Sequence, residues 1–192
     1  MAGILLIISG PSGVGKSTLC KRLVERLDAF LSISATTRPR RENEMDGKDY
    51  HFLTVEQFER GLEENRFLEY ATVYGGQYYG TPAEPVLTAL DAGRVAILEI
   101  EIEGTLQVVR RCPDAVSIYL LAPTLADQQD RLAGRQKTSA ETADAIKERL
   151  SKADGEIRYA TECGAYRHFV VNADIGETVD QIVQIVEEKR NA

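Results

Sequence analysis

Cysteine is scarce in this chain, and its three cysteines are scattered. Cys20, Cys112 and Cys163 have neither the close spacing of metal ligands nor the even number of a disulfide framework. The sequence therefore argues against a cysteine-based metal site and against a disulfide scaffold. It favours a reducing compartment, and we expect the cytoplasm.

Long runs of one kind of residue are also missing. The net charge is −7 and no long basic run occurs, which argues against a nucleic-acid-binding surface. The first apolar run is too short to span a membrane and leads directly into a glycine-rich loop, so we expect neither a signal sequence nor a membrane partner. The 192 residues contain no repeat or low-complexity segment and are enough for one compact domain with a substantial core.

A glycine-rich phosphate loop, GPSGVGKS, occupies Gly10–Ser17. The aliphatic run over residues 4–8 before it predicts a strand buried on both faces of a parallel sheet. Leu19, Leu23 and Leu27 after it recur at helical spacing and predict a helix. Strand, turn and helix in this order can direct backbone N–H groups and a helix N-terminus at one anion.

This loop predicts a binding site for the phosphates of a nucleotide, and by itself it fits kinases, motor proteins, transporters and switches alike. Lys16 would place its positive charge at the β- and γ-phosphates, and the Ser17 hydroxyl would complete a Mg²⁺ shell with phosphate oxygens and water. The loop residues that we expect to bind the nucleotide are Gly10, Pro11, Ser12, Gly13, Val14, Gly15, Lys16, Ser17 and Thr18.

Alternating strands and helices predict an α/β fold with a mainly parallel sheet covered on both faces. The expected core strands are residues 4–9, 32–36, 94–101, 116–121 and 168–172. Helices are expected after Lys16, Pro82, Glu103 and Thr124, near residues 140–162 and near residues 177–189. The polar and aromatic segment 37–79 breaks this alternation, so we expect it to form an inserted lobe.

Arginines are concentrated at the start of this lobe. Arg38, Arg40 and Arg41 lie within a short span that also contains Glu44 and Tyr50. Guanidinium groups pair bidentately with phosphate oxygens, and a phenol adds a neutral donor, so the segment predicts a cage for the phosphate of an acceptor. The alternative is a solvated basic loop whose charge is balanced by neighbouring acids.

The chain resembles the guanylate kinases, which transfer the γ-phosphate of ATP to GMP. The resemblance rests on GPSGVGKST, SISATTRPRR, DGKDYHF, FLEYATVYGGQYYGTP, ILEIEIEG, RLAGR and VVNADI, in family order and at close to family spacing. It implies the fold of the P-loop nucleoside monophosphate kinases in a single domain over residues 1–192. The implied parts are a core over about 1–36, 82–124 and 165–192, a GMP-binding lobe over about 37–81 and a lid over about 125–164.

The resemblance also implies the acceptor site. The residues matching those that hold the GMP phosphate are Arg38, Arg41, Tyr50 and Tyr79, and those matching the residues around the guanine are Ser34, Glu69 and Thr81. Glu101 stands where the family has an acid facing the base, and Glu44 is a further expected GMP-binding residue. Guanine presents N1–H and a 2-amino group as donors, which carboxylates complement. Adenine lacks this donor pair, so a site that leaves its carboxylate unpaired should reject AMP.

Two acids in the segment ILEIEIEG are expected to have different roles. Glu99 and Glu101 lie two residues apart at the carboxyl end of a predicted strand, so their side chains would share one face near the Mg²⁺ of the loop. We expect Glu99 to hold a metal-bound water and Glu101 to face the base.

On the donor side, Arg131 and Arg135 lie four apart on a predicted helix and share a face, and Arg149 follows on the next helix. Without the resemblance these would be ordinary surface charges. The resemblance implies that they close over the ATP phosphates as a lid, and that Asn172 lies near the adenine. The implied catalytic set is Lys16, Arg41, Arg131, Arg135 and Arg149.

The expected activity is phosphorylation of GMP, and of dGMP, with MgATP. One alternative is a kinase of the same fold acting on a sugar phosphate such as ribose 1,5-bisphosphate, against which Ser34, Glu69 and Glu101 argue. Another is a protein-binding module without catalysis, against which the intact loop argues. The sequence is compatible with a monomer and with a homodimer.

Five features depart from the family pattern. Glu101 is longer than the usual aspartate, Glu103 replaces a frequent glutamine, and Ala173 stands where an acid is common. Residues 136–148 are a longer stretch than usual, and YGGQYYG, residues 74–80, is one residue longer than its family counterpart. Because none of these removes a phosphate-binding group, we expect altered affinity and not lost activity.

Overall fold

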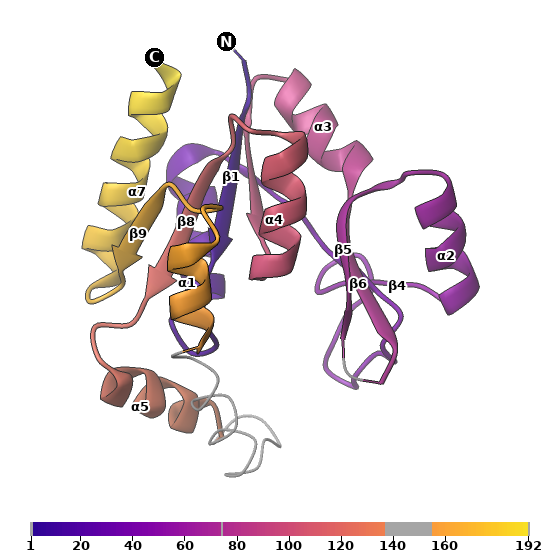
Figure 1. Cartoon of the computed structure of the whole chain (residues 1–192), viewed down its shortest axis with the longest axis horizontal. Coiled ribbons are helices and arrows are strands. Elements are labelled where there is room, and N and C mark those ends of the chain that lie inside the picture. Colours follow the sequence, from indigo (N-terminus) through magenta and orange to yellow (C-terminus); the bar gives the residue numbers. More distant parts are fainter. Residues whose placement is uncertain (1, 74, 137–154, 192) are drawn as a thin grey trace.

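The computed structural model describes residues 2–73, 75–136 and 155–191. A parallel-sheet core lies beside a smaller lobe, as Figure 1 shows. The core sheet has the order β2-β7-β1-β8-β9, and its pairings are all parallel. Its strands are β1 (Ile4–Ser9), β2 (Phe30–Leu31), β7 (Val95–Glu99), β8 (Val116–Leu121) and β9 (His168–Val171).

Helices cover both faces of this sheet, which confirms the predicted α/β class. They are α1 (Lys16–Leu27), α3 (Ala83–Asp91), α4 (Ile102–Arg111), α5 (Leu125–Gln136) and α7 (Ile175–Arg190), with a further helical segment over residues 155–162. Because side chains alternate along a strand, Leu6 and Ile8 of β1 pack with α1 and α7, whereas Leu5 and Ile7 pack with α3 and α4.

The lobe contains its own sheet, in the order β4-β3-β6-β5. Its elements are β3 (Ala35–Thr36), β4 (His51–Phe52), α2 (Val55–Glu63), β5 (Phe67–Val73) and β6 (Gln77–Pro82). A capping box between Thr54 and Gln57 begins α2. The helix packs on the sheet through Phe58, whose ring stacks on those of Phe67 and Tyr78 at centroid distances of 4.3 and 5.1 Å.

The predicted core strand over residues 32–36 is wrong. The core sheet uses Phe30–Leu31, and Ala35–Thr36 pairs instead with β4 and β6 of the lobe. The chain crosses from one sheet to the other here. Short β-forming stretches carry no local signal for which sheet they join, since pairing is decided by tertiary packing.

The predicted strand over residues 94–101 is too long. Strand β7 ends at Glu99, and Glu101 is the N-cap of α4, with φ −87° and ψ 174°. The two acids therefore do not share a strand face, and α4 begins at Ile102, before Glu103. Of the helices that the structure describes, none is long and apolar enough to cross a membrane.

Candidate active site

The phosphate loop joins β1 to α1 at the carboxyl edge of the core sheet. Gly13 and Gly15 have φ of 87° and 95°, a region that favours glycine. A Cβ at Gly15 would lie 2.7 Å from Nδ2 of Asn172, and one at Gly13 would lie 2.7 Å from Cγ of Leu132. The loop is thus closed in on two sides by side chains from β9's end and from α5.

Lys16 lies across the loop that precedes it. Its ammonium group donates hydrogen bonds to the carbonyl oxygens of Gly10 at 2.5 Å and Pro11 at 3.1 Å. Burial lowers the pKa of Lys16, while the carboxylates of Glu99 and Glu101 act in the opposite direction. The charge is therefore held close to the anion-binding backbone and within range of both acids.

Ser17, at the start of α1, reaches the end of β7. Its hydroxyl donates a 2.7 Å hydrogen bond to Oε1 of Glu99. One hydroxyl and one carboxylate are the oxygen ligands that Mg²⁺ takes from proteins when phosphates and waters supply the rest. Among residues 2–73, 75–136 and 155–191, no group of three or more His, Cys, Asp or Glu side chains could hold a metal ion.

Helix α5 supports the loop through side chains that bond to its backbone. Nε2 of the buried Gln128 donates to the Ser12 carbonyl at 2.6 Å. Arg131 donates to the carbonyls of Val14 at 3.3 Å and Asn172 at 2.9 Å. Sequence reasoning missed Gln128. Its place three residues before Arg131, on the same helix face, is the signal that could have found it.

Asn172 is also committed to the loop. Its side chain is buried, its Nδ2 donates to the Val14 carbonyl at 2.8 Å, and its Oδ1 accepts from the Thr178 hydroxyl at 3.2 Å. These bonds give Asn172 a role in holding the loop against α7. Its contact with adenine stays a prediction.

In the lobe, Arg38 is the centre of a polar cluster with Glu44, Tyr50 and Tyr79. Its Nε donates to the Tyr79 hydroxyl at 3.1 Å and its Nη2 to Oε1 of Glu44 at 2.6 Å. The guanidinium lies 5.5 Å from the centroid of the Tyr50 ring. The structure thus brings together Arg38, Tyr50 and Tyr79, three of the residues predicted at the acceptor phosphate, with the expected GMP-binding residue Glu44.

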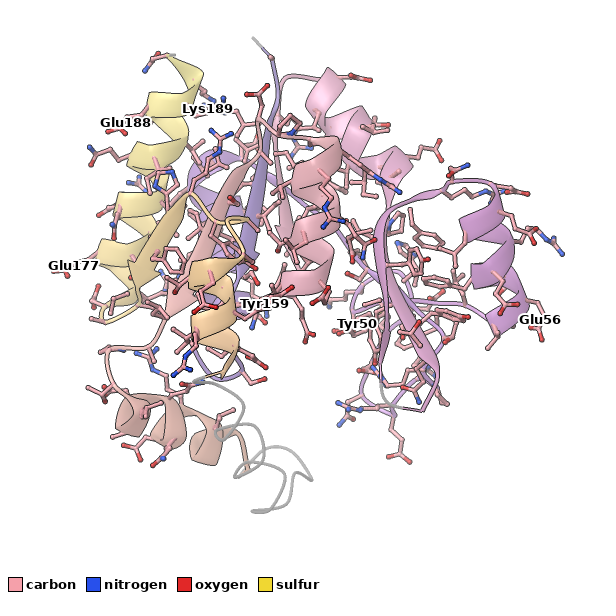
Figure 2. The ribbon with its side chains drawn as sticks, viewed as in Figure 1. Tyr50, Glu56, Tyr159, Glu177, Glu188 and Lys189 are labelled. Atoms are coloured by element: carbon pink, nitrogen blue, oxygen red, sulfur yellow. The ribbon has the colours of Figure 1, made fainter. Side chains whose placement is uncertain are left out.

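Glu44 serves as a brace within this cluster. One carboxylate oxygen pairs with Arg38 and the other accepts from the Arg41 backbone N–H at 2.8 Å. The side chain of Arg38 and that backbone N–H hold the pKa of Glu44 below its ordinary value. The Arg41 side chain is exposed, whereas Arg38, Tyr50 and Tyr79 are half-buried. Figure 2 places Tyr50 on the side of the lobe nearer the core, and Glu56 on the outer side.

Glu69 and Thr81 form a buried pair beside this cluster. They face each other across β5 and β6, and the Thr81 hydroxyl donates a 2.6 Å hydrogen bond to Oε1 of Glu69. Glu69 is buried, with only 6% of its surface exposed. Burial raises the pKa of Glu69; the Thr81 hydrogen bond opposes this, and the charge of Glu101 adds to it.

Two other predicted base-site residues lie at element ends. Ser34 directly precedes β3 and is half-buried, and its carbonyl accepts from the His51 backbone N–H at 2.9 Å. Glu101 is exposed at the N-cap of α4. Arg149 and the side chain of Arg135 lie outside the described residues.

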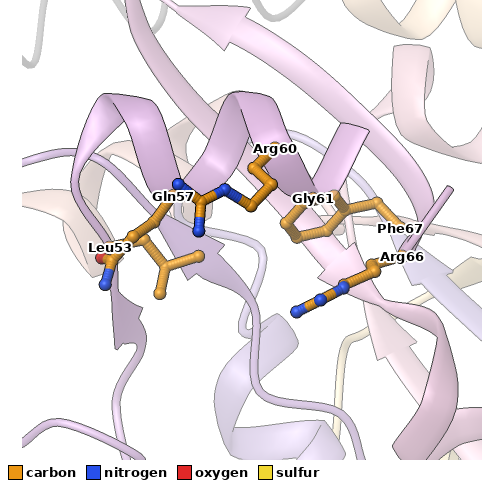
Figure 3. A pocket seen from close by; sticks show the side chains of 6 residues that line it. All are labelled: Leu53, Gln57, Arg60, Gly61, Arg66 and Phe67. Atoms are coloured by element: carbon orange, nitrogen blue, oxygen red, sulfur yellow. The ribbon is translucent and has the colours of Figure 1, made fainter. Parts of the chain in front are cut away.

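A cavity of about 290 Å³ opens between α2 and β5 in the lobe (Figure 3). It is lined by Leu53, Gln57, Arg60, Gly61, Arg66 and Phe67. None of these is a predicted site residue, and the polar groups described above lie elsewhere. We therefore do not place either nucleotide in it.

Known proteins are similar to this chain over nearly its whole length. A family model described as guanylate kinase matches residues 3–189. The guanylate kinase of Clostridium acetobutylicum is 42% identical over 184 residues, covering 96% of this chain and 85% of its own. That of Clostridium perfringens strain 13 is 44% identical over 185 residues, covering 96% and 82%. The crystal structure of guanylate kinase from Anaplasma phagocytophilum matches with a TM-score of 0.75 and 31% identity, covering 98% of this chain and 86% of that one.

Proposed function

Because the chain belongs to the guanylate kinase family, we propose that it transfers the γ-phosphoryl group of MgATP to the phosphate of GMP, giving ADP and GDP. The same reaction with dGMP is included in the proposal. The product would supply guanine nucleotides. The free thiols of Cys20, Cys112 and Cys163 support a site of action in the reducing cytoplasm.

The observation that carries the choice of acceptor is the buried pair of Glu69 and Thr81. A carboxylate of which one oxygen already accepts from Thr81 needs further donors, and guanine offers them at N1 and at its 2-amino group. AMP would leave that buried acceptor unpaired and place a base nitrogen acceptor against it. A site built on such a polar contact discriminates strongly, by about 10⁴-fold or more in comparable enzymes.

The acceptor phosphate is assigned to the cluster around Arg38. Arg38, Tyr50 and Tyr79 already contact one another, so binding an anion requires little further ordering. Arg41 lies next to this cluster with an exposed side chain that can turn toward the phosphate. Guanidinium groups offset the repulsion between the acceptor's own charge and the donor's phosphates.

The donor phosphates are assigned to the loop and to Lys16. On binding, Lys16 would exchange its bonds to the Gly10 and Pro11 carbonyls for phosphate oxygens, while the backbone N–H groups of the loop and of the first turn of α1 hold the rest. Ser17 and, through water, Glu99 would hold the Mg²⁺ that comes with the nucleotide, and this ion would supply charge neutralisation for the phosphates.

Catalysis then follows from alignment and from charge. No side chain needs to form a covalent intermediate, because a GMP phosphate oxygen attacks the γ-phosphorus directly and in line. Lys16 and Arg41, with the predicted lid arginines Arg131, Arg135 and Arg149, stabilise the charge on the transferred group. Closing the site also limits transfer to water.

Neither alternative function, a sugar-phosphate kinase or a protein-binding module without catalysis, is favoured. A sugar phosphate would leave Glu69 buried without the base donors that its position suits. A protein-binding module has no need for the set of Lys16, Ser17 and Glu99, which together match phosphoryl transfer.

The test is ADP formation from MgATP with GMP, dGMP, AMP, CMP and ribose 1,5-bisphosphate offered separately. We expect rapid turnover with GMP and dGMP and at most traces with the other three. Rapid turnover with AMP but not GMP would refute the guanine assignment, and turnover only with ribose 1,5-bisphosphate would favour the sugar-phosphate alternative.

A further inference from the structure

One face of α4 in the core is bonded to β5 in the lobe. Gly104, Gln107 and Arg111 lie at spacings of three and four residues, so they share this helix face. Each meets a different point of the strand around Glu69. Figure 1 shows α4 on the side of the core that faces β5 and β6.

Strand β5 is irregular just before Glu69. Phe67 pairs with Pro82 and Glu69 with Thr81, so two steps along β5 correspond to one step along β6, and Leu68 is the extra residue of a bulge. A bulge bends its strand and re-aims the side chains beside it. The carbonyls of Phe67 and Leu68 both accept from Nη1 of Arg111, each at 2.9 Å, which holds the bulge in place.

On the other side of Glu69, Gln107 fixes the backbone of Tyr70. Its Nε2 donates to the Tyr70 carbonyl at 2.7 Å, and its Oε1 accepts from the Tyr70 N–H at 3.1 Å. The side-chain amide thereby makes both hydrogen bonds that a residue of a neighbouring strand would make. The backbone of β5 is therefore held before and after Glu69.

The Glu69 carboxylate itself lies against Gly104. A Cβ at position 104 would be 2.5 Å from Oε2 and 3.0 Å from Cδ of Glu69. The other oxygen, Oε1, accepts from Thr81. The carboxylate is thus confined between Thr81 and the first turn of α4, and any side chain at position 104 must displace it.

We propose that Gly104, Gln107 and Arg111 are specificity-determining positioning residues, which fix the aim of Glu69 without touching the nucleotide. This inference rests on the proposed function, in that Glu69 reads the guanine. It follows that disturbing the α4–β5 junction changes the choice and the KM of the acceptor while the KM of ATP is conserved.

The first test is Gly104→Ala, with Gly176→Ala as its matched control. Both glycines lie in the first turn of a helix, and the atom nearest an added Cβ at Gly176 would be Oδ1 of the exposed Asp174, at 3.1 Å. Alanine is the better helix former at both sites, so helix propensity does not favour unfolding of either variant. Gly104→Ala should raise the KM for GMP by roughly tenfold or more, the effect of one misplaced buried polar contact. The KM for ATP should stay within about twofold, and Gly176→Ala should match the wild type in both constants.

The second test compares GMP with IMP, whose base lacks the 2-amino group. Gln107→Glu keeps the side-chain shape but removes the donor to Tyr70, and Arg111→Ala frees the bulge carbonyls. Both variants should reduce the preference for GMP over IMP by at least about fivefold, whereas Arg110→Ala, at an exposed neighbouring position, should not. An unchanged preference in both junction variants would overturn the inference.

A double-mutant cycle decides whether Gly104 acts through Glu69. In a Glu69→Gln background, Gly104→Ala should change the KM for GMP by no more than about twofold, because the contact it disturbs is already weakened. Equal effects in both backgrounds would overturn the inference.

The outcomes also separate this inference from the proposed function. If the wild type does not use GMP, the proposed function fails. If the wild type uses GMP, and Gly104→Ala and Gln107→Glu both behave as wild type, only this inference fails.

Discussion

The hydroxyl of Ser17 donates a 2.7 Å hydrogen bond to Glu99, although the two residues lie 82 positions apart in the chain. The contact joins the first turn of α1 to the end of β7, whose residue Glu99 pairs in register with Ile8 of β1. Both oxygens thus lie at the carboxyl edge of a parallel sheet, where ligands of such sheets bind. This geometry supports the assignment of the Mg²⁺-nucleotide to that edge.

Glu99→Gln should therefore weaken the response to Mg²⁺. Removing the charge while keeping the shape should lower kcat by about 10- to 100-fold, as for other residues that orient a metal through its shell. The concentration of Mg²⁺ giving half-maximal rate should rise. A titration of rate against Mg²⁺ measures both, with the exposed Glu103→Gln as control; coincident curves for Glu99→Gln and wild type would contradict the assignment.

Lys16→Met should nearly abolish turnover, by at least about 10²-fold in kcat, because it removes a charge placed at the transferring group. The acceptor cluster lies on the lobe and does not include Lys16, so GMP should still bind, as calorimetry can measure. Lys21→Met, on the exposed face of α1, should be active. Loss of GMP binding by a folded Lys16→Met protein would count against a separate acceptor site.

Arg38→Met should chiefly raise the KM for GMP, by about 10- to 100-fold, since charged hydrogen bonds to a phosphate are among the stronger ones. Arg41→Met should act in the same direction. Arg40 is exposed and bonds to the Glu44 carbonyl, so Arg40→Met is the matched control. Steady-state kinetics with GMP and ATP varied separately would reveal an error if the KM for ATP rose instead.

Glu69→Gln should weaken the use of GMP and raise the stability of the folded protein at neutral and alkaline pH. Burial raises the pKa of Glu69 above its ordinary value of 4.5, so the folded protein loses stability as pH rises through the raised pKa. The glutamine variant lacks this loss and should be more stable than wild type at pH 8, with the difference shrinking toward pH 4. Thermal unfolding between pH 4 and 8 measures this difference, and GMP kinetics should show the lost base contact. A variant less stable than wild type at pH 8 would mean that the buried carboxylate is better compensated than its contacts indicate.

Gln128→Leu should disturb the donor site by removing a support of the phosphate loop. It removes the donor of a part-buried hydrogen bond to the Ser12 carbonyl, which should cost about 0.5–1.5 kcal/mol of stability. The KM for ATP should rise more than that for GMP, since the loop lies on the donor side. The exposed Gln184→Leu serves as control. Equal changes in both KM values would indicate a general loss of structure.

The phosphate loop could be predicted in detail because all of its residues are consecutive in the sequence, from Gly10 to Ser17. The alternation of β and α elements likewise predicted the parallel core. The acceptor cluster needed the resemblance, because Arg38 and Tyr79 are 41 residues apart and meet only through the pairing of β3 with β6.

Other features could not be derived from local patterns. The bulge at Leu68 depends on Arg111, from an element 43 positions away, and the support of the loop by Gln128 spans 116 positions. Such contacts join elements whose packing is decided by the whole fold, so periodicity within one element does not reveal them. The prediction of a single core strand over residues 32–36 was wrong for the same reason, because the chain there crosses from β2 in the core sheet to β3 in the lobe sheet.

Competition between GMP and AMP shows whether the base pocket around Glu69 selects guanine. Equal concentrations of the two nucleotides are incubated with MgATP and a catalytic amount of the protein, and the nucleoside diphosphates are separated and quantified. An isotopic label on AMP distinguishes ADP made from AMP from ADP made from ATP. We predict that GDP forms and that the label stays in AMP. Label appearing in ADP as fast as GDP forms would rule out guanine selection by this pocket.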